Sequence, residues 1–182
     1  VIIPIDYDFI EQKNHLAQLL KNGNITGFDL DNNIKLPNEY QGLFEQLGPY
    51  YLTKKESLKG LINRDGNAII DFKYQKIKPI NDSLFWVKTD SSWSLITDQQ
   101  KNILNGISTY SLLFKNVFLY VKNNKYGLIY GDQSIHYPAE YDAIQSILHH
   151  DNPLFQFEIF IASAPLHIVI TKDFSGYLIH SQ

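Results

Sequence analysis

The stretch Gly60-Leu61-Ile62-Asn63-Arg64-Asp65-Gly66 contains a small residue, an apolar pair and a polar turn, in that order. The same order recurs at Gly27-Phe28-Asp29-Leu30-Asp31, at Ser94-Leu95-Ile96-Thr97-Asp98 and at Gly127-Leu128-Ile129-Tyr130-Gly131. Internal repeats with a period of about 20 to 50 residues are typical of solenoids, propellers and related arrays. This recurrence therefore decides the fold class before any single strand is assigned.

Two further elements repeat along the chain with the first. Apolar segments that end in lysine occupy residues 50–54, 84–88 and 118–122. A tyrosine followed three residues later by an aliphatic residue occurs five times, with steps of 33, 34, 36 and 31 residues between the tyrosines. The five pairs are Tyr7/Ile10, Tyr40/Leu43, Tyr74/Ile77, Tyr110/Leu113 and Tyr141/Ile144.

The spacing predicts an all-β fold with little helix, in which about five tandem antiparallel β-hairpin repeats form a solenoid-like or propeller-like array. Each unit is expected to run strand, turn, strand, turn, strand, because its turns carry pairs such as Asn22-Gly23 and Asn123-Asn124 that tolerate positive φ. One helix is plausible at 11–21, where the leucines could form a stripe. The predicted units of a single repeat domain, 1–182, are about 7–39, 40–73, 74–109, 110–140 and 141–182, with an insertion at about 147–162.

These features resemble the WG repeat of bacterial proteins, whose units read as Trp-Gly or a similar pair, two aliphatic residues, a turn and a strand leading to Tyr. The most similar segments are 59–66, running on to Tyr74, and 126–129, running on to Tyr141. The Trp-Gly pair itself is replaced, for example by Lys59-Gly60 and by Trp93-Ser94. The resemblance implies an array of β-hairpins with an interaction role and transfers no active site.

Composition excludes several classes of function. The chain has no cysteine, so disulfides and thiolate metal sites are excluded. Arg64 is the only arginine, and the net charge is -3, which argues against nucleic-acid binding. The apolar run at 155–165 is shorter than the roughly 20 residues of a membrane-spanning helix, so no membrane partner is expected. We expect a cytoplasmic protein, or a periplasmic or envelope protein if a signal has been removed, and no cofactor.

The segment His149-His150-Asp151 has the residues most suited to catalysis, since two imidazoles beside a carboxylate can bind a metal or transfer a proton. Neighbouring residues on a strand point to opposite faces, however, so the two histidines could share one ion only within a turn. A polar loop before Asn152-Pro153 is the favoured interpretation. We therefore predict no catalytic residue and no metal site.

The predicted function is that of a non-enzymatic scaffold that binds one protein partner. Acidic residues would form an anionic face toward a basic partner, and tryptophans would add aromatic contacts. The specific hypothesis is an immunity or antitoxin-like protein that blocks a toxic effector such as a nuclease; the alternative is an envelope or periplasmic glycan-binding module. The predicted partner-binding residues are Asp142, His149, His150, Asp151, Glu158, Trp86 and Trp93.

Overall fold

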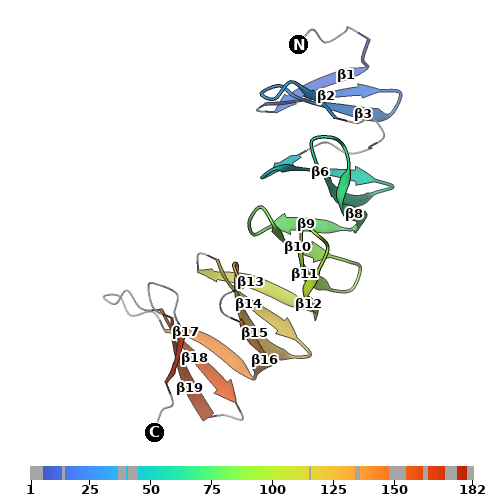
Figure 1. Cartoon of the computed structure of the whole chain (residues 1–182). Coiled ribbons are helices and arrows are strands. Elements are labelled where there is room, and N and C mark those ends of the chain that lie inside the picture. Colours follow the sequence, from blue (N-terminus) through green and yellow to red (C-terminus); the bar gives the residue numbers. More distant parts are fainter. Residues whose placement is uncertain are drawn as a thin grey trace. The chain divides into compact units, whose positions relative to one another are not determined.

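The computed structural model of this chain is all-β, as predicted, and the part of the chain that it describes contains no helix. Its strands form five sheets of four antiparallel strands each, and every sheet is open (Figure 1). The chain divides into two compact units, Val1–Asn105 and Gly106–Gln182, which we describe separately. The described residues are 6–13, 15–36, 40, 45–114, 116–133, 136–147, 155–161, 164–170 and 176–179.

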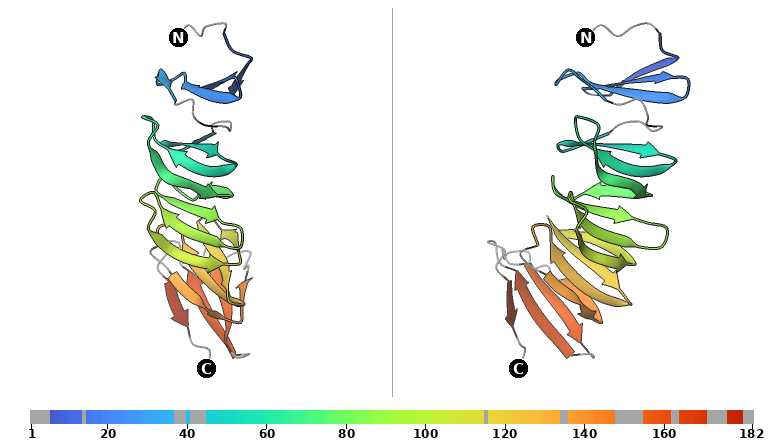
Figure 2. Two further views of the ribbon diagram at one scale, coloured as in Figure 1. Left: turned by 90° about the vertical axis from the view of Figure 1, so that its right-hand side faces the viewer. Right: turned by 45° about the vertical axis from the view of Figure 1, so that its right-hand side comes forward.

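The strands of each sheet follow one another in chain order, and Figure 2 shows them side by side. The first sheet contains β1 (Phe9–Lys13), β2 (Leu16–Lys21), β3 (Asn24–Asp29) and β4 (Ile34–Lys35). The second contains β5 (Glu45–Leu47), β6 (Tyr50–Lys55), β7 (Leu58–Ile62) and β8 (Ala68–Tyr74). The third contains β9 (Lys76–Pro79), β10 (Leu84–Lys88), β11 (Trp93–Thr97) and β12 (Asn102–Ile107).

The last two sheets have the same order. The fourth contains β13 (Thr109–Phe114), β14 (Val117–Lys122), β15 (Lys125–Tyr130) and β16 (His136–Tyr141). The fifth contains β17 (Ala143–Ile147), β18 (Phe155–Ile161), β19 (Ala164–Ile170) and β20 (Gly176–Ile179). Each sheet falls within one predicted repeat unit, apart from single residues at Tyr74, Thr109 and Tyr141. A unit therefore has four strands, where the sequence predicted three.

In the first three sheets the second strand is buried on both of its faces. In β2 the four residues from Leu16 to Leu19 are all buried, and in β10 so are the four from Leu84 to Val87. Such a strand is nearly continuously apolar, and a short apolar run does not distinguish a buried strand from a buried helix. For this reason the prediction of a helix at 11–21 was wrong: this segment contains most of β1 and all of β2.

Two-residue turns connect the second and third strands in three sheets. Both residues have positive φ at Asn22-Gly23, Glu56-Ser57 and Asn123-Asn124. This is the type I′ geometry that matches the right-handed twist of the flanking strands. The positive φ predicted for the two asparagine-containing turns is confirmed.

The core of the first unit is built between neighbouring sheets. Leu52 and Leu61 of the second sheet pack against Phe85, Val87 and neighbouring apolar residues of the third. On the opposite face of the second sheet, side chains of β6 and β7 pack against the first sheet in a separate cluster. The apolar residues on these faces are buried because a neighbouring sheet covers them. The repeats therefore depend on one another for burial.

The repeat position predicted for tyrosine is occupied by an aliphatic residue before the fourth sheet. The backbone N–H of Gln75 donates to the carbonyl of Lys88 at 2.8 Å, and that of Ser108 donates to the carbonyl of Val121 at 2.8 Å. Ile107, fully buried, thus takes the place of Tyr74. The steps from 74 to 107 and from 107 to 141 are then 33 and 34 residues, so the predicted use of Tyr110 as the repeat marker was wrong.

The predicted insertion at 147–162 is largely a regular part of the fifth sheet. Its second half contains β18, which pairs with β17 on one side and with β19 on the other. The connection from β17 to β18 covers residues 148–154, whereas the equivalent connection in the second sheet covers only 48–49. The residues predicted to form an insertion are therefore those of β18 and of the longer connection that precedes it.

Candidate functional site

A row of lysines begins at the hairpin end of the second sheet. Lys54 on β6 and Lys59 on β7 are directly opposite each other, and Lys59 is in turn opposite Tyr74 on β8. Both lysines lie on the face that carries Leu52 and Leu61, because side chains two residues apart share a face. Like charges directly opposite in an antiparallel pair repel each other and cost stability.

The third sheet continues this pattern with an aromatic ring. Lys76 on β9 is opposite Lys88 on β10, and Lys88 is opposite Trp93 on β11. The Nζ atoms of Lys78 and Lys88 lie 5.9 and 5.8 Å from the centre of the half-buried Trp93 ring. Two ammonium groups thus share one indole, an arrangement that orders the lysines without neutralising them.

We call six lysines at this hairpin end of the two sheets the lysine edge. No ion pair involves any of them among the described residues. Two carboxylates lie in the turns at this end of the two sheets: Glu56 in the β6–β7 turn, and Asp90 in the β10–β11 turn, which accepts a hydrogen bond from Gln75. The positive charge of the edge therefore exceeds the negative charge beside it. The six members are Lys54, Lys55, Lys59, Lys76, Lys78 and Lys88.

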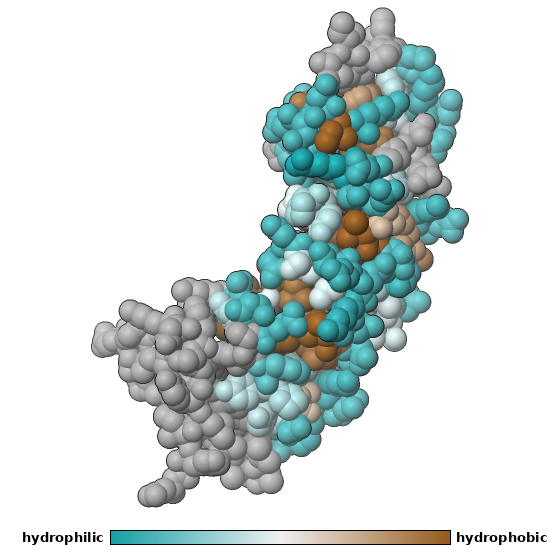
Figure 3. Space-filling model, in the orientation of Figure 1, coloured by the Kyte–Doolittle hydropathy of each residue, from teal (hydrophilic) through white to brown (hydrophobic). Residues whose placement is uncertain are grey.

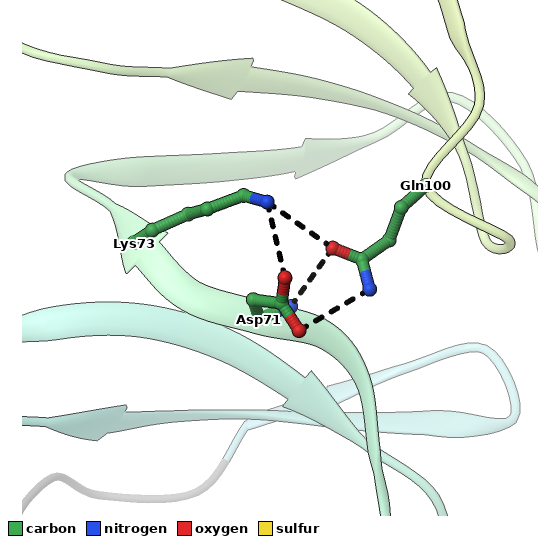
Figure 4. A network of polar contacts seen from close by, with 3 residues as sticks. All are labelled: Asp71, Lys73 and Gln100. Atoms are coloured by element: carbon green, nitrogen blue, oxygen red, sulfur yellow. Dashed lines mark hydrogen bonds and ion pairs between the residues drawn. The ribbon is translucent and has the colours of Figure 1, made fainter.

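Three lysines outside the lysine edge, Lys21, Lys73 and Lys125, are paired with carboxylates. Lys73 on β8 forms an ion pair with Asp71 at 3.0 Å, and Gln100 of the following sheet donates to Asp71 at 3.2 Å (Figure 4). Lys21 is paired with Asp6 in the same way, at exposed sites in the first sheet. These three lysines are neutralised by a neighbouring carboxylate, whereas none of the six lysines of the lysine edge forms an ion pair among the described residues.

A small polar recess lies at the equivalent hairpin of the first sheet. Its volume is about 200 Å³. Lys21, Asn22 and Asn24 line it at the β2–β3 hairpin, and Lys35 comes from β4. The recess is suited to a small polar or anionic group, although the charge of Lys21 is already shared with a carboxylate.

A buried carboxylate joins the first and second sheets. Asp29, fully buried, accepts hydrogen bonds from the Tyr51 hydroxyl and from the side chain and backbone of Asn32. Burial alone would raise the pKa of Asp29, but these donors outweigh it and hold the pKa below its ordinary value of 3.8. Burial and the bond to Asp29 raise the pKa of Tyr51 to about 12. This pair therefore has a structural role in the core.

Trp86, one of the predicted partner-binding residues, lies in the core. Trp86 is 1% exposed, and Tyr51 and Tyr120 are also buried. The Tyr120 hydroxyl lies 2.8 Å from Nε2 of His136. Only Trp93 of the two tryptophans reaches the surface, where it contacts the lysine edge. Burial explains the difference, since the second strands carrying these side chains are covered on both faces.

The other predicted partner-binding residues belong to the second unit of the chain. Asp142 is exposed beyond the end of β16 and is paired with Lys125. Glu158 belongs to β18, where its backbone is opposite Gln145 and His167. His149, His150 and Asp151 lie outside the described residues.

The lysine edge was missed by sequence reasoning, although a signal was present. The lysines at the ends of the apolar segments 50–54 and 84–88 were read only as markers of the repeat. Their pairing partners, Lys59 and Lys76, become neighbours only when the register is known. A pattern of lysines at both sides of a predicted turn would have been the available clue.

Metal ligands, membrane-spanning helices and exposed apolar side chains can be assessed for the residues that the structure describes. No group of three or more His, Cys, Asp or Glu side chains there could hold a metal ion. Within the same residues, no helix has the length and apolarity needed to cross a membrane. The large exposed hydrophobic side chains lie on β1 and β13, and in Figure 3 apolar residues appear as separate spots among hydrophilic ones. They are Phe9, Ile10, Leu112 and Leu113.

Comparison with known families supports the WG-repeat resemblance. Residues 60–93 match the family model described as WG containing repeat. This stretch runs from the third strand of the second sheet to the start of β11, so it contains three of the six lysines of the lysine edge, Lys76, Lys78 and Lys88. No curated protein matches the sequence.

Solved structures show only distant similarity. Kluyveromyces lactis Hsv2 aligns with a TM-score of 0.37 and 11% identity over 97% of this chain and 62% of that one. The N-terminal domain of Nup159 gives 0.39 and 9%, over 95% and 60%. The extracellular domain of the putative one component system BT4673 from B. thetaiotaomicron gives 0.36 and 9%, over 96% and 30%. The chain thus spans less than two thirds of each, and scores this low support no functional argument.

Proposed function

We propose that this chain is a non-enzymatic repeat scaffold that binds a protein partner through the hairpin edge of its first unit. The observation that carries the proposal is the lysine edge, where Lys54 opposes Lys59 and Lys76 opposes Lys88. Charges kept at such positions cost stability, and a partner that neutralises them offsets the cost. The hairpins that carry them are fixed by the core below.

The use of the polar groups inside the fold supports a scaffold over an enzyme. Asp29 and Tyr51 are engaged with each other in the core, and the Tyr120 hydroxyl contacts His136 within one sheet. Groups engaged in this way position neighbouring strands. Their role is consistent with a protein that presents a surface.

Affinity capture from a native lysate tests the proposal. The bait is the full tagged chain, and the comparison bait carries Lys54→Gln, Lys59→Gln, Lys76→Gln and Lys88→Gln. We expect one stoichiometric protein that the first bait retains and the second does not. Equal recovery on both baits would place binding elsewhere, and recovery of no protein would contradict the scaffold role.

The narrower form of the proposal is an immunity or antitoxin-like protein in the cytoplasm that blocks a toxic effector. The acidic excess of 19 over 16 residues motivated this form, but Asp6 and Asp142 are paired with lysines, and an effector bound at the lysine edge would contribute an acidic segment. Co-expression with each toxin encoded beside its gene should restore growth in one case. Rescue from none of them would refute this form and leave the scaffold role intact.

A further inference from the structure

We infer that the lysine edge binds an acidic polypeptide segment, an inference that rests on the proposed protein-binding function and names the chemistry of the partner. The starting point is charge. The two opposed lysine pairs lie on neighbouring sheets, one on β6 and β7 and the other on β9 and β10. Strands in a sheet are about 4.8 Å apart and stacked sheets about 10 Å apart, so four ammonium groups gather within the reach of one short segment.

The faces of the sheets determine how these groups are arranged. Lys54 and Lys59 share the face of the second sheet that packs against the third. Lys76 and Lys88 share the face of the third sheet opposite to the one that carries Val87. The two pairs therefore lie on either side of the β10–β11 hairpin, and a segment crossing this hairpin contacts both.

Trp93 orders Lys88 of the second pair, together with Lys78, before an anion binds. Lys78 and Lys88 both approach its ring, which restricts the two side chains without consuming their charge. Restricting rotamers before binding lowers the entropy lost when a carboxylate arrives. A half-buried indole at this place also adds apolar contact to a side chain next to the acidic residues.

Nucleic acid fits the same surface less well than polypeptide. The basic groups of the edge are all lysines, whereas bidentate recognition of phosphate and guanine depends on arginine. The only arginine, Arg64, lies in the turn at the opposite end of β7 from Lys59. The Trp93 ring, on which a base could stack, is already contacted by two lysines. An acidic peptide needs only point charges at short spacing.

The test is a titration of a fluorescein-labelled peptide of ten glutamates with the full chain, followed by anisotropy. We expect saturable binding, and about tenfold weaker binding to the Lys76→Gln/Lys78→Gln/Lys88→Gln variant, since several exposed ion pairs are lost together. The matched control, Lys101→Gln/Lys122→Gln/Lys125→Gln, removes the same charge outside the edge. It should change affinity less than twofold, roughly the effect of net charge alone.

A second readout locates the contact. Binding should change the intrinsic fluorescence of the chain, and this change should disappear in Trp93→Phe, because Trp86 is buried in the core. A labelled oligothymidylate of equal charge should bind more weakly than the peptide at the same ionic strength.

Three results would overturn the inference: no binding of the peptide, an equal loss in the control variant, or tighter binding of the oligonucleotide. If the peptide fails while affinity capture still yields a protein partner, the acidic segment is wrong and the scaffold stands. If both experiments fail, the proposed function fails with it.

Discussion

Asp29 occupies a position that the other repeats fill with an aliphatic residue. By register, Asp29 is opposite Leu16, as Ile62 is opposite Tyr51 and Ile96 is opposite Phe85. In the second and third sheets, an isoleucine at this position lies opposite an aromatic residue. In the first sheet the position holds Asp29, whose carboxylate accepts a hydrogen bond from the phenol of Tyr51 in the second sheet. A buried polar pair of this kind stabilises little compared with an apolar pair of the same shape, but breaking it is costly.

Removing one partner of this pair should therefore destabilise more than replacing both. We expect Tyr51→Phe to lower the free energy of unfolding by about 1.5–3 kcal/mol, because the buried Asp29 carboxylate loses a donor. The double variant Asp29→Ile/Tyr51→Phe should lie within about 1 kcal/mol of the parent. Urea unfolding of the four proteins of this cycle measures both. Tyr50→Phe, which removes a part-buried bond to Asp98 at 3.0 Å, is the control, and additive effects would refute the coupling.

The same pair makes stability depend on pH at both ends of the scale. The folded pKa of Asp29 is lowered, so its stabilisation is present above the unfolded value of about 3.8 and is lost as pH falls below it. The folded pKa of Tyr51 is raised to about 12, so its stabilisation is present below 10 and is lost between 10 and about 12. The parent should lose stability faster than Asp29→Ile/Tyr51→Phe in both windows. Parallel curves for the two proteins would contradict this assignment.

The glycine of the repeat is required by close contacts, which explains its recurrence. A Cβ on Gly60 would lie 2.7 Å from the carbonyl oxygen of Ile70 and 2.9 Å from the Phe72 ring, and one on Gly127 would overlap the Tyr120 ring. We expect Gly60→Ala to cost about 1–3 kcal/mol through overpacking.

Ser94 occupies the same repeat position and supplies the comparison. Ser94→Ala should stay within about 0.5 kcal/mol of the parent, and Gly127→Ala should behave like Gly60→Ala. Thermal unfolding of the three variants measures the contrast. A Gly60→Ala protein as stable as Ser94→Ala would show that the close approach at Gly60 relaxes at little cost.

At the scale of single elements, the turns could be predicted from sequence and the strand boundaries could not. Asn and Gly are favoured in turns because they tolerate positive φ, so the turns at Asn22-Gly23 and Asn123-Asn124 can be recognised in the sequence. By contrast, the chain passes from one sheet to the next at Gln75 and Ser108 through single residues that carry no turn signal. Without a turn signal, the last strand of one unit and the first strand of the next are predicted as a single strand. This is why three strands were expected in each unit.

The β11–β12 turn is held to the preceding sheet by exposed polar contacts (Figure 4), and its contribution should be small. Gln100, at a φ of 59°, contacts both Asp71 and Lys73. We expect Gln100→Ala to lower the free energy of unfolding by less than about 1 kcal/mol, since these groups are solvated. Amide hydrogen exchange should quicken at 98–101 and remain unchanged at the β10–β11 hairpin. Faster exchange throughout the third sheet would show that the turn supports the whole sheet.

For the whole molecule, periodicity was sufficient to predict the class of fold. The chain forms five open β-sheets, and the steps from Tyr74 to Ile107 and from Ile107 to Tyr141 are 33 and 34 residues. The match at 60–93 supports the WG resemblance. The site could not be predicted in the same way. Acidic residues scattered over the sequence suggested an anionic face, but Asp6 and Asp142 are paired with lysines. The opposed lysines of the lysine edge become neighbours only through the strand register.

The most direct test of the lysine edge as the binding surface is zero-length carbodiimide cross-linking of the full chain to its captured partner, which joins a lysine amine only to a carboxylate in contact with it. We expect links from Lys54, Lys59, Lys76 and Lys88 to aspartates or glutamates of one acidic segment. Links confined to Lys101, Lys122 or Lys125, or links from this chain's carboxylates to lysines of the partner, would contradict it.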